Sequence, residues 1–138
     1  MYKRQILYGD IILDKQGSFS IISGDQIILA LSQNLNNYKV SKVVFAMESD
    51  GLYVVDKSNS DNCKLVSECY SNELDSLDLA DLGQKIDVTG GIKGKLDFIR
   101  TICKSKIPVQ LINGLIEGYI HKSLKNQNLN CTNILINE

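Results

Sequence analysis

A polar segment with two adjacent glycines, residues 87–95, carries the residue types best suited to chemistry in this chain. Gly90 and Gly91 allow positive φ values and let the backbone approach an anion closely. The apolar residues that follow have helical spacing, and a helix start presents free N–H groups and the positive end of its dipole. Lys95 would add a mobile positive charge. The segment predicts a phosphate-binding turn, and a plain connector between two elements is the alternative.

A second polar segment, residues 23–26, precedes apolar residues at helical spacing. Ser23 and Gln26 have the separation of a capping box, which predicts that a helix starts here. Asp25 would then lie in the first turn of that helix. An acid at this position either complements the helix dipole or takes part in a site, and the local pattern leaves both interpretations open.

A third group, Asp50, Gly51 and Tyr53, follows the apolar run Val43–Met47. This run has the continuous apolar character of a strand that is buried on both faces. Ligands in open α/β sheets bind at the carboxyl ends of such strands, which favours a binding role for the three residues. An ordinary Asp-Gly turn is the alternative.

The elements that must position these residues alternate between strands and helices. We expect a hairpin at residues 6–22, a helix from residue 24, strands at 43–47 and 64–70, an acidic solvated segment at 73–81, a helix after residue 93, a strand at 109–112, a helix at 115–124 and a strand at 132–136. The alternation predicts an α/β domain, with a mostly parallel open sheet and helices on both of its faces.

The composition excludes several classes of protein. With 138 residues, 43% apolar and 22% charged, the chain has the make-up of one globular domain. The net charge is −1 and the lysines are scattered, so we expect no nucleic-acid partner. We also find neither an apolar run of the ~20 residues that span a membrane nor the apolar core of a secretion signal. We therefore expect a cytoplasmic protein with no membrane partner.

The cysteines do not form a metal-binding pattern. Cys63, Cys69, Cys103 and Cys131 lack paired C-x-x-C spacing, and His121 is the only histidine that could join them. We expect buried or free thiols and no metal site built from these residues; a Cys63–Cys69 disulfide is the alternative, although a chain without a secretion signal normally keeps its thiols reduced.

The first five residues raise a separate question. Residues 2–5 are what the codons TAT-AAG-AGA-CAG would encode, and these codons form the end of a widely used sequencing-library transposon. We therefore interpret residues 1–5 as an adapter scar. Whether the reading frame begins at a contig edge would settle this hypothesis.

Taken together and in order, these segments resemble the amino acid kinase superfamily and, within it, the archaeal isopentenyl phosphate kinases. The resemblance rests on Tyr8-Gly9-Asp10 with its hairpin, Ser23-Gly24-Asp25, Asp50-Gly51-Leu52-Tyr53, Asp87-Val88-Thr89-Gly90-Gly91 with Lys95, and a weaker Asn113-Gly114. It covers residues 6–138 and corresponds to the carboxyl-terminal, ATP-holding half of such a kinase. The fold would then be half of the family's αβα sandwich.

The resemblance implies phosphoryl transfer from ATP to isopentenyl phosphate, without a covalent enzyme intermediate. Lys95 matches the family lysine that neutralises the ATP phosphates. Asp25 matches the carboxylate that orients lysines around the transferred group.

The remaining roles follow from the same resemblance. Gly90 and Gly91 would bind phosphate, Gly24 would lie near the acceptor phosphate, and Asp50, Gly51 and Tyr53 would lie beside adenine and ribose. Magnesium is expected with ATP, and the parent enzyme is expected to be a homodimer. The family's other half supplies a glycine-rich loop, a catalytic lysine and a histidine for the acceptor. We therefore expect this chain alone to be inactive.

Three departures from the family pattern affect the choice of acceptor. Gln26 stands where a second acid often follows, Glu48 replaces a frequent Asp, and Asn113-Gly114 lacks the usual Pro. Kinases that act on amino acids, carbamate or nucleoside monophosphates share this half of the fold. A non-catalytic nucleotide-binding or regulatory module and an α/β domain without a ligand are further alternatives.

Overall fold

The computed structural model describes residues 7–35, 37–55, 63–80 and 91–137. In these ranges the strands are β1 (Asp10–Leu13), β2 (Phe19–Ile22), β3 (Val43–Met47), β4 (Tyr53–Val55), β5 (Cys63–Leu65), β6 (Glu68–Tyr70), β7 (Val109–Asn113) and β8 (Cys131–Leu135). The helices are α1 (Gly24–Asn34), α2 (Gly91–Lys104) and α3 (Tyr119–Leu124). Residues 1–5, which we interpret as an adapter scar, lie outside the described residues.

The main sheet has four strands in the order β3-β7-β8-β6. β3 pairs with β7 and β6 with β8 in parallel, whereas β7 and β8 are antiparallel. The expectation of an α/β fold with mostly parallel pairing is thus confirmed. The antiparallel pair arises because residues 125–130 bring the chain back to the end where it left β7, and Cys131 there pairs with Ile112.

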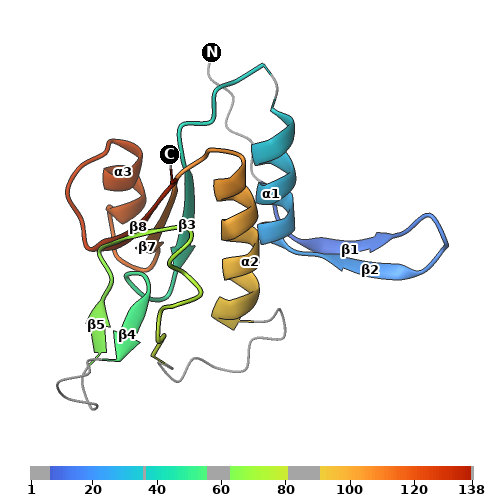
Figure 1. Cartoon of the computed structure of the whole chain (residues 1–138). Coiled ribbons are helices and arrows are strands. Elements are labelled where there is room, and N and C mark those ends of the chain that lie inside the picture. Colours follow the sequence, from blue (N-terminus) through green and yellow to red (C-terminus); the bar gives the residue numbers. More distant parts are fainter. Residues whose placement is uncertain (1–6, 36, 56–62, 81–90, 138) are drawn as a thin grey trace.

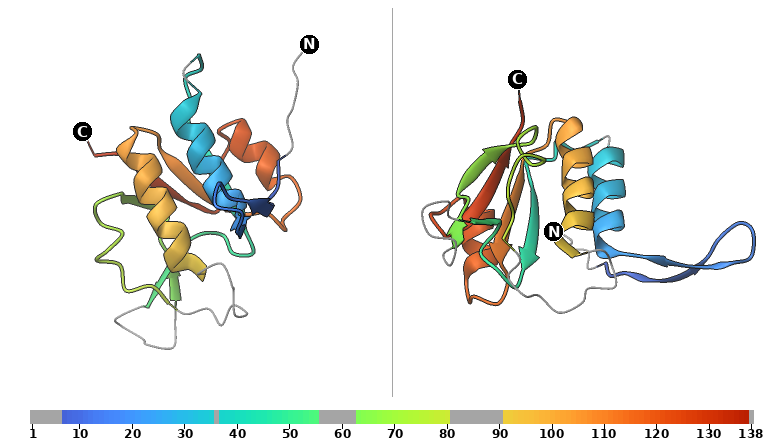
Figure 2. Two further views of the ribbon diagram at one scale, coloured as in Figure 1. Left: turned by 90° about the vertical axis from the view of Figure 1, so that its right-hand side faces the viewer. Right: turned by 60° about the horizontal axis from the view of Figure 1, so that its bottom comes forward.

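Helices cover both faces of the sheet, as expected (Figures 1 and 2). α2 packs directly on one face, and α1 lies beside α2 on its outer side. α3 lies on the opposite face, against β7. None of the residues of α1 is buried, so α1 is held to the rest of the molecule mainly through α2.

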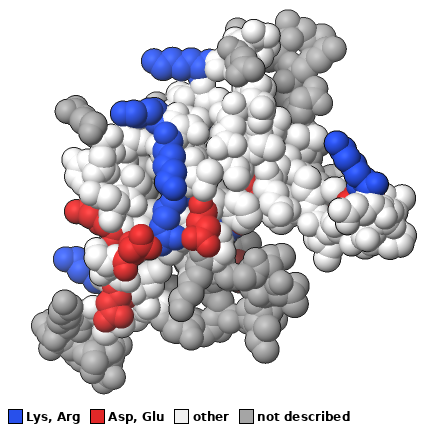
Figure 3. Space-filling view, turned by 45° about the vertical axis from the view of Figure 1, so that its right-hand side comes forward, with Lys and Arg blue, Asp and Glu red and all other residues white. Residues whose placement is uncertain are grey.

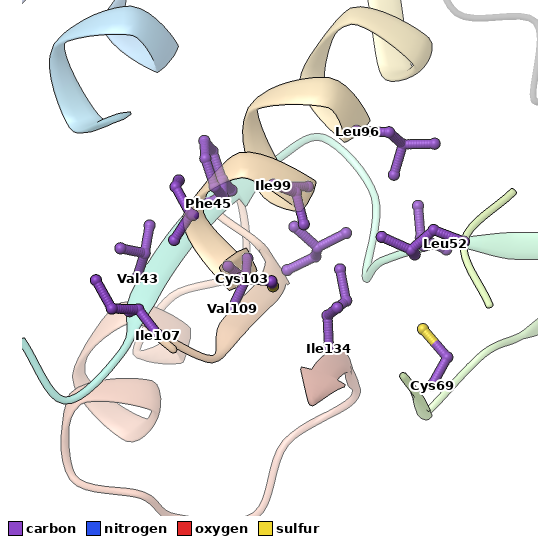
Figure 4. Close-up of a cluster of buried hydrophobic side chains, with 13 residues drawn as sticks. Val43, Phe45, Leu52, Cys69, Leu96, Ile99, Cys103, Ile107, Val109 and Ile134 are labelled. Carbon is purple, nitrogen blue, oxygen red and sulfur yellow. The ribbon is translucent and has the colours of Figure 1, made fainter. Parts of the chain in front are cut away.

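The hydrophobic core lies between α2 and the sheet (Figure 4). The predicted inward residues of α2 are all buried: Leu96, Ile99, Ile102 and Cys103. They face side chains of β3, β7 and β8, among them Phe45, Leu111 and Ile134. Burial of one such Ile or Leu side chain contributes about 1.5–3 kcal/mol to folding, so this layer fixes the position of α2.

A polar network attaches α3 to the other face of the sheet. The Lys42 ammonium donates to Gln110 Oε1 at 3.1 Å, to Asn126 Oδ1 at 2.9 Å and to the Ser123 carbonyl oxygen. The Ser123 hydroxyl also donates to Gln110 Oε1. Since Ser123 is fully buried, these bonds satisfy polar groups that would otherwise be costly to bury.

The predicted hairpin forms from β1 and β2 and projects away from the sheet (Figure 1). Apolar side chains on one of its faces stay largely exposed: Ile11, Leu13, Phe19 and Ile21. In the space-filling view the hairpin is mostly white, and elsewhere on that face acidic and basic side chains lie next to one another (Figure 3). The hairpin therefore contributes little to the core.

Three details of the expected pattern are corrected by the structure. The first is β3, which is not buried on both faces: Val43 and Phe45 are buried, but Ala46 is exposed. Within the described residues β3 is an edge strand of the main sheet, which explains this alternation.

The second correction concerns residues 64–70, where two strands replace one. β5 pairs with β4, and β6 pairs with β8 in the main sheet. The chain changes sheets at Val66, whose N–H donates to the Leu52 carbonyl and whose carbonyl accepts from the Thr132 hydroxyl.

The third correction concerns residues 115–124, where the helix begins only at Tyr119. The Asn113 side chain accepts from the Leu115 N–H, which forms a turn in competition with a helix.

The acidic side chains of segment 73–81 form a solvated face where the structure describes them, as expected, because Asp75 and Asp78 are exposed. Leu74 is buried in the core, and Asp75 forms an ion pair with Arg100 of α2. Asp81 lies outside the described residues. None of the helices in the described part of the chain has the length and apolar character needed to cross a membrane.

We predict that one thiol reacts quickly with Ellman's reagent in the native chain. Cys63 is exposed, whereas Cys69, Cys103 and Cys131 are buried and all four are free. Burial also raises the pKa of Cys69 and of Cys103 to about 11, which suppresses their reactive thiolate forms. Cys63→Ser should remove the fast phase, and denaturant should expose the remaining thiols. A fast phase of two or more thiols in the native chain would contradict the packing described here.

Candidate nucleotide-binding site

The candidate site lies at the end of the molecule where two parallel strands end and two helices begin. Met47 of β3 and Asn113 of β7 are paired, so the two strands finish together. α1 and α2 both start at this end, which points downward in Figure 1. The helix starts therefore present their positive dipole ends beside the loops that leave the sheet.

The start of α1 is fixed by the predicted capping box. Ser23 Oγ accepts from the Gln26 N–H at 3.2 Å, and Gln26 Oε1 accepts from the Ser23 N–H at 2.7 Å. This reciprocal pair satisfies two backbone donors and places Asp25 in the first turn. The sequence prediction of this helix start is confirmed.

Asp25 and Lys95 come together as an ion pair. Lys95 Nζ lies 2.6 Å from Asp25 Oδ2, and the two side chains are 23% and 27% exposed. The contact joins the first turn of α1 to the second turn of α2. The two residues to which the resemblance assigns charged roles thus lie side by side, and both side chains are partly exposed.

Asp50 and Tyr53 form a second polar group after β3. Asp50 Oδ1 is buried and has no hydrogen-bond partner within the described residues. Burial raises the pKa of the Tyr53 phenol, and the charge and hydrogen bonding of Asp50 raise it further. The phenol therefore stays protonated at neutral pH. No hydrogen bond or ion pair in the described part of the chain joins this group to the Asp25–Lys95 pair.

Gly51 is required by close packing. A Cβ atom at this position would lie 2.1 Å from Thr132 Oγ1, and the φ angle is +158°. The Thr132 hydroxyl also accepts from the Leu52 N–H at 2.9 Å, which ties the loop to β8. Close packing against Thr132 thus explains why this residue is a glycine. The nucleotide-binding role of Gly51 stays a prediction.

The other predicted glycines lie in different surroundings. Gly24 is the first residue of α1, and no heavy atom lies within 4 Å of the Cβ it would carry, so it faces open space. Gly91 is the first residue of α2. Gly90 lies outside the described residues. Gly114 donates its N–H to the Met47 carbonyl, which links the loops that follow β3 and β7.

Two residues of this end were missed by sequence reasoning. Phe45 of β3 lies under Lys95, with the ammonium 5.1 Å from the centre of its ring. Thr132 is fully buried and holds Gly51 and Leu52. An apolar run predicts only that Phe45 is buried, and nothing in the pattern signals which side chain covers its ring. For Thr132, the one signal in the sequence was a polar residue within a predicted strand.

His121 lies away from the Asp25–Lys95 pair. His121 belongs to α3, on the opposite face of the sheet (Figure 1). Within the described ranges no three potential ligands among His, Cys, Asp and Glu come close enough to hold a metal ion.

The fold and this arrangement of charge and helix starts are typical of α/β proteins that bind phosphate groups. The model of the amino acid kinase family matches residues 3–113. The chain therefore belongs to the amino acid kinase family.

Curated relatives and solved structures narrow the similarity. The chain is 30% identical over 131 residues to the isopentenyl phosphate kinase of Methanothermobacter thermautotrophicus, which covers 94% of this chain and 47% of that protein. It is 32% identical over 119 residues to the isopentenyl phosphate kinase of Methanocaldococcus jannaschii, with 86% and 41% coverage. An X-ray structure of isopentenyl phosphate kinase superposes with a TM-score of 0.64 at 23% identity, covering 93% of this chain and 43% of that one. The chain thus spans less than half the length of these relatives.

We predict that Gly51→Ala destabilises the fold. The added methyl group would collide with Thr132, and overpacking of this kind costs about 1–3 kcal/mol. Gly24→Ala is the matched control, because its methyl group would meet no neighbour. Its stability should stay within about 0.5 kcal/mol of the parent. Urea denaturation of both variants would measure the difference, and equal midpoints would contradict the packing of this loop.

Proposed function

We propose that this chain is the ATP-binding half of a kinase that transfers the γ-phosphate of ATP to isopentenyl phosphate, giving isopentenyl diphosphate and ADP. In this proposal residues 6–138 form the half-domain, and a second half supplies the groups that hold the acceptor. The names of the curated relatives support the choice of acceptor.

The observation that carries the proposal is the Asp25–Lys95 pair between two helix starts. Phosphoryl transfer needs positive charge beside the phosphates and little covalent help from the protein. Lys95 would supply that charge, together with the N–H groups at the start of α2. Asp25 would keep the ammonium in position until a phosphate arrives, since the pair is partly exposed and a polyanion can compete for the lysine.

The loop after β3 would hold the nucleoside. The buried Asp50 Oδ1 lacks a partner in the described residues and would accept a hydrogen bond from a ribose hydroxyl or an adenine amino group. Tyr53 remains protonated and would offer an aromatic face. Gly51 would keep this loop tight against β8 by its close packing with Thr132.

The residues present are compatible with magnesium that arrives with ATP. Mg²⁺ is usually held by substrate phosphates, waters and one or two carboxylates rather than by a full protein cage. Asp25 is a carboxylate near the proposed phosphate position and would be the protein's contribution. When bound, the ion would neutralise charge on the phosphate oxygens.

In the chemical step, a terminal phosphate oxygen of the acceptor attacks the γ-phosphorus, and the bond from that phosphorus to the β–γ bridging oxygen breaks. The negative charge that develops between the β- and γ-phosphates would be stabilised by Lys95 and by the Gly90 and Gly91 backbone. The acceptor phosphate would approach near Gly24, where the structure leaves open space. We further propose that the whole protein is a homodimer.

We predict that the 138-residue chain alone does not phosphorylate isopentenyl phosphate and binds Mg·ATP only weakly. It would lack the groups that orient the acceptor, and such proximity effects are worth about 7–11 kcal/mol of a barrier. A coupled ADP-release assay and calorimetry would test this. Measurable turnover or sub-micromolar ATP affinity would contradict the half-domain proposal.

We predict that Lys95→Ala lowers kcat strongly in a chain completed with the amino-terminal half of a relative. Loss of one donor to a developing charge typically costs about 10²–10³ in rate. The chain should still fold, because a partly exposed ion pair contributes only about 0–1 kcal/mol and an exposed cation–π contact about 0.5–1 kcal/mol.

Lys104→Ala is the matched control for this experiment. Lys104 lies in the last turn of the same helix, at the opposite end from the proposed phosphates. Its kcat should stay within about two-fold of the parent, since surface substitutions away from a site have small effects. If the two substitutions changed kcat equally, residues 87–95 would be a plain connector rather than a phosphate-binding turn.

A further inference from the structure

We propose that the aromatic face of Phe45 positions the Lys95 ammonium, making Phe45 a positioning residue for the phosphate-binding lysine. The inference rests on the proposed function for its consequence in nucleotide binding. It differs from that proposal because it concerns a buried residue of β3 that need not touch the nucleotide.

Three elements meet at the Lys95 ammonium. Asp25 of α1 binds it at 2.6 Å, and the Phe45 ring of β3 lies beneath it at 5.1 Å from the ring centre. Phe45 is 5% exposed and packs in the core that holds α2 to the sheet. The ring is therefore a fixed platform, whereas the lysine and the aspartate are partly open to solvent.

The energies of the two contacts indicate why the ring matters. An exposed or partly exposed ion pair is typically worth about 0–1 kcal/mol, because solvent screens it and the long side chains lose freedom. A cation over an aromatic face gains about 0.5–1 kcal/mol when exposed and about 2 kcal/mol when desolvated. The ring contact is thus at least comparable with the ion pair and does not depend on Asp25.

The ion pair and the ring contact of Lys95 respond differently when phosphate binds. A nucleotide phosphate competes with Asp25 for the same ammonium, but it does not compete with the ring, which lies on the core side. Phe45 would therefore keep the lysine at its place while its anionic partner changes. If Phe45 served only to fill the core, weakening the attraction of its ring for cations would not change the position of Lys95.

The decisive variant replaces Phe45 by pentafluorophenylalanine through site-specific incorporation. The fluorinated ring keeps nearly the same shape and burial, but its face no longer attracts a cation. Phe45→Leu is a second variant that keeps an apolar side chain and removes the ring. The order of the Lys95 ammonium would be measured by NMR, Mg·ATP affinity by titration, and stability by urea denaturation, all in the 138-residue chain.

We expect the fluorinated variant to stay folded and slightly less stable than the parent, since it loses only the ring contact, to lose order at the Lys95 ammonium, and to bind Mg·ATP about 3- to 10-fold more weakly. Phe45→Leu should show the same loss of order and of affinity. Unchanged Lys95 order in the fluorinated variant would overturn the role of Phe45.

The proposed function fails by a different result. If Lys95→Ala binds Mg·ATP as the parent does, the nucleotide site is wrong. The NMR comparison still decides the positioning role in that case, because it needs no nucleotide.

Discussion

The packing of α2 against the sheet is the constraint on which the rest of the structure depends. Its buried face, with Ile99 and Ile102 fully enclosed, meets β7 and β8 in the core. α1 is attached mainly through α2 and buries none of its own residues completely. Both charged residues of the Asp25–Lys95 pair are therefore placed by one hydrophobic layer. The buried layer lies behind the helix, and Lys95 of the same helix stays partly exposed.

The parallel pairing of β3 with β7 adds a second condition. It brings the Asp50 loop and the Asn113 loop to the same end of the sheet, where both helices begin. The Gly114 N–H then joins the two loops through the Met47 carbonyl. Helix dipoles, a lysine and a buried carboxylate oxygen that has no hydrogen-bond partner in the described part of the chain are thus gathered by fold topology rather than by residues close in sequence.

Local features of the fold could be predicted from the sequence, because the interactions that fix them are local. The capping box at Ser23 and the inward face of α2 depend on spacings of a few residues, and both are confirmed. The split of residues 64–70 could not be predicted in this way. It depends on Val66 bonding to Leu52 and Thr132, which are distant in the chain.

The same distinction applies to the candidate site. The types of Asp25 and Lys95 indicated a charged site, but only the packing of α1 on α2 shows that the two side chains touch. The place of Phe45 beneath the ammonium depends on three elements at once. No spacing pattern contains that information. Roles of Gly90 and of the rest of residues 81–90 stay predictions, since they lie outside the described residues.

The most direct test of the central claim is a crystal structure of the 138-residue chain with magnesium and a non-hydrolysable ATP analogue. We predict phosphate oxygens within hydrogen-bond distance of Lys95 Nζ, beside the starts of α1 and α2, and the nucleoside near Asp50 and Tyr53. A nucleotide bound on the opposite face of the sheet, near α3, would contradict it.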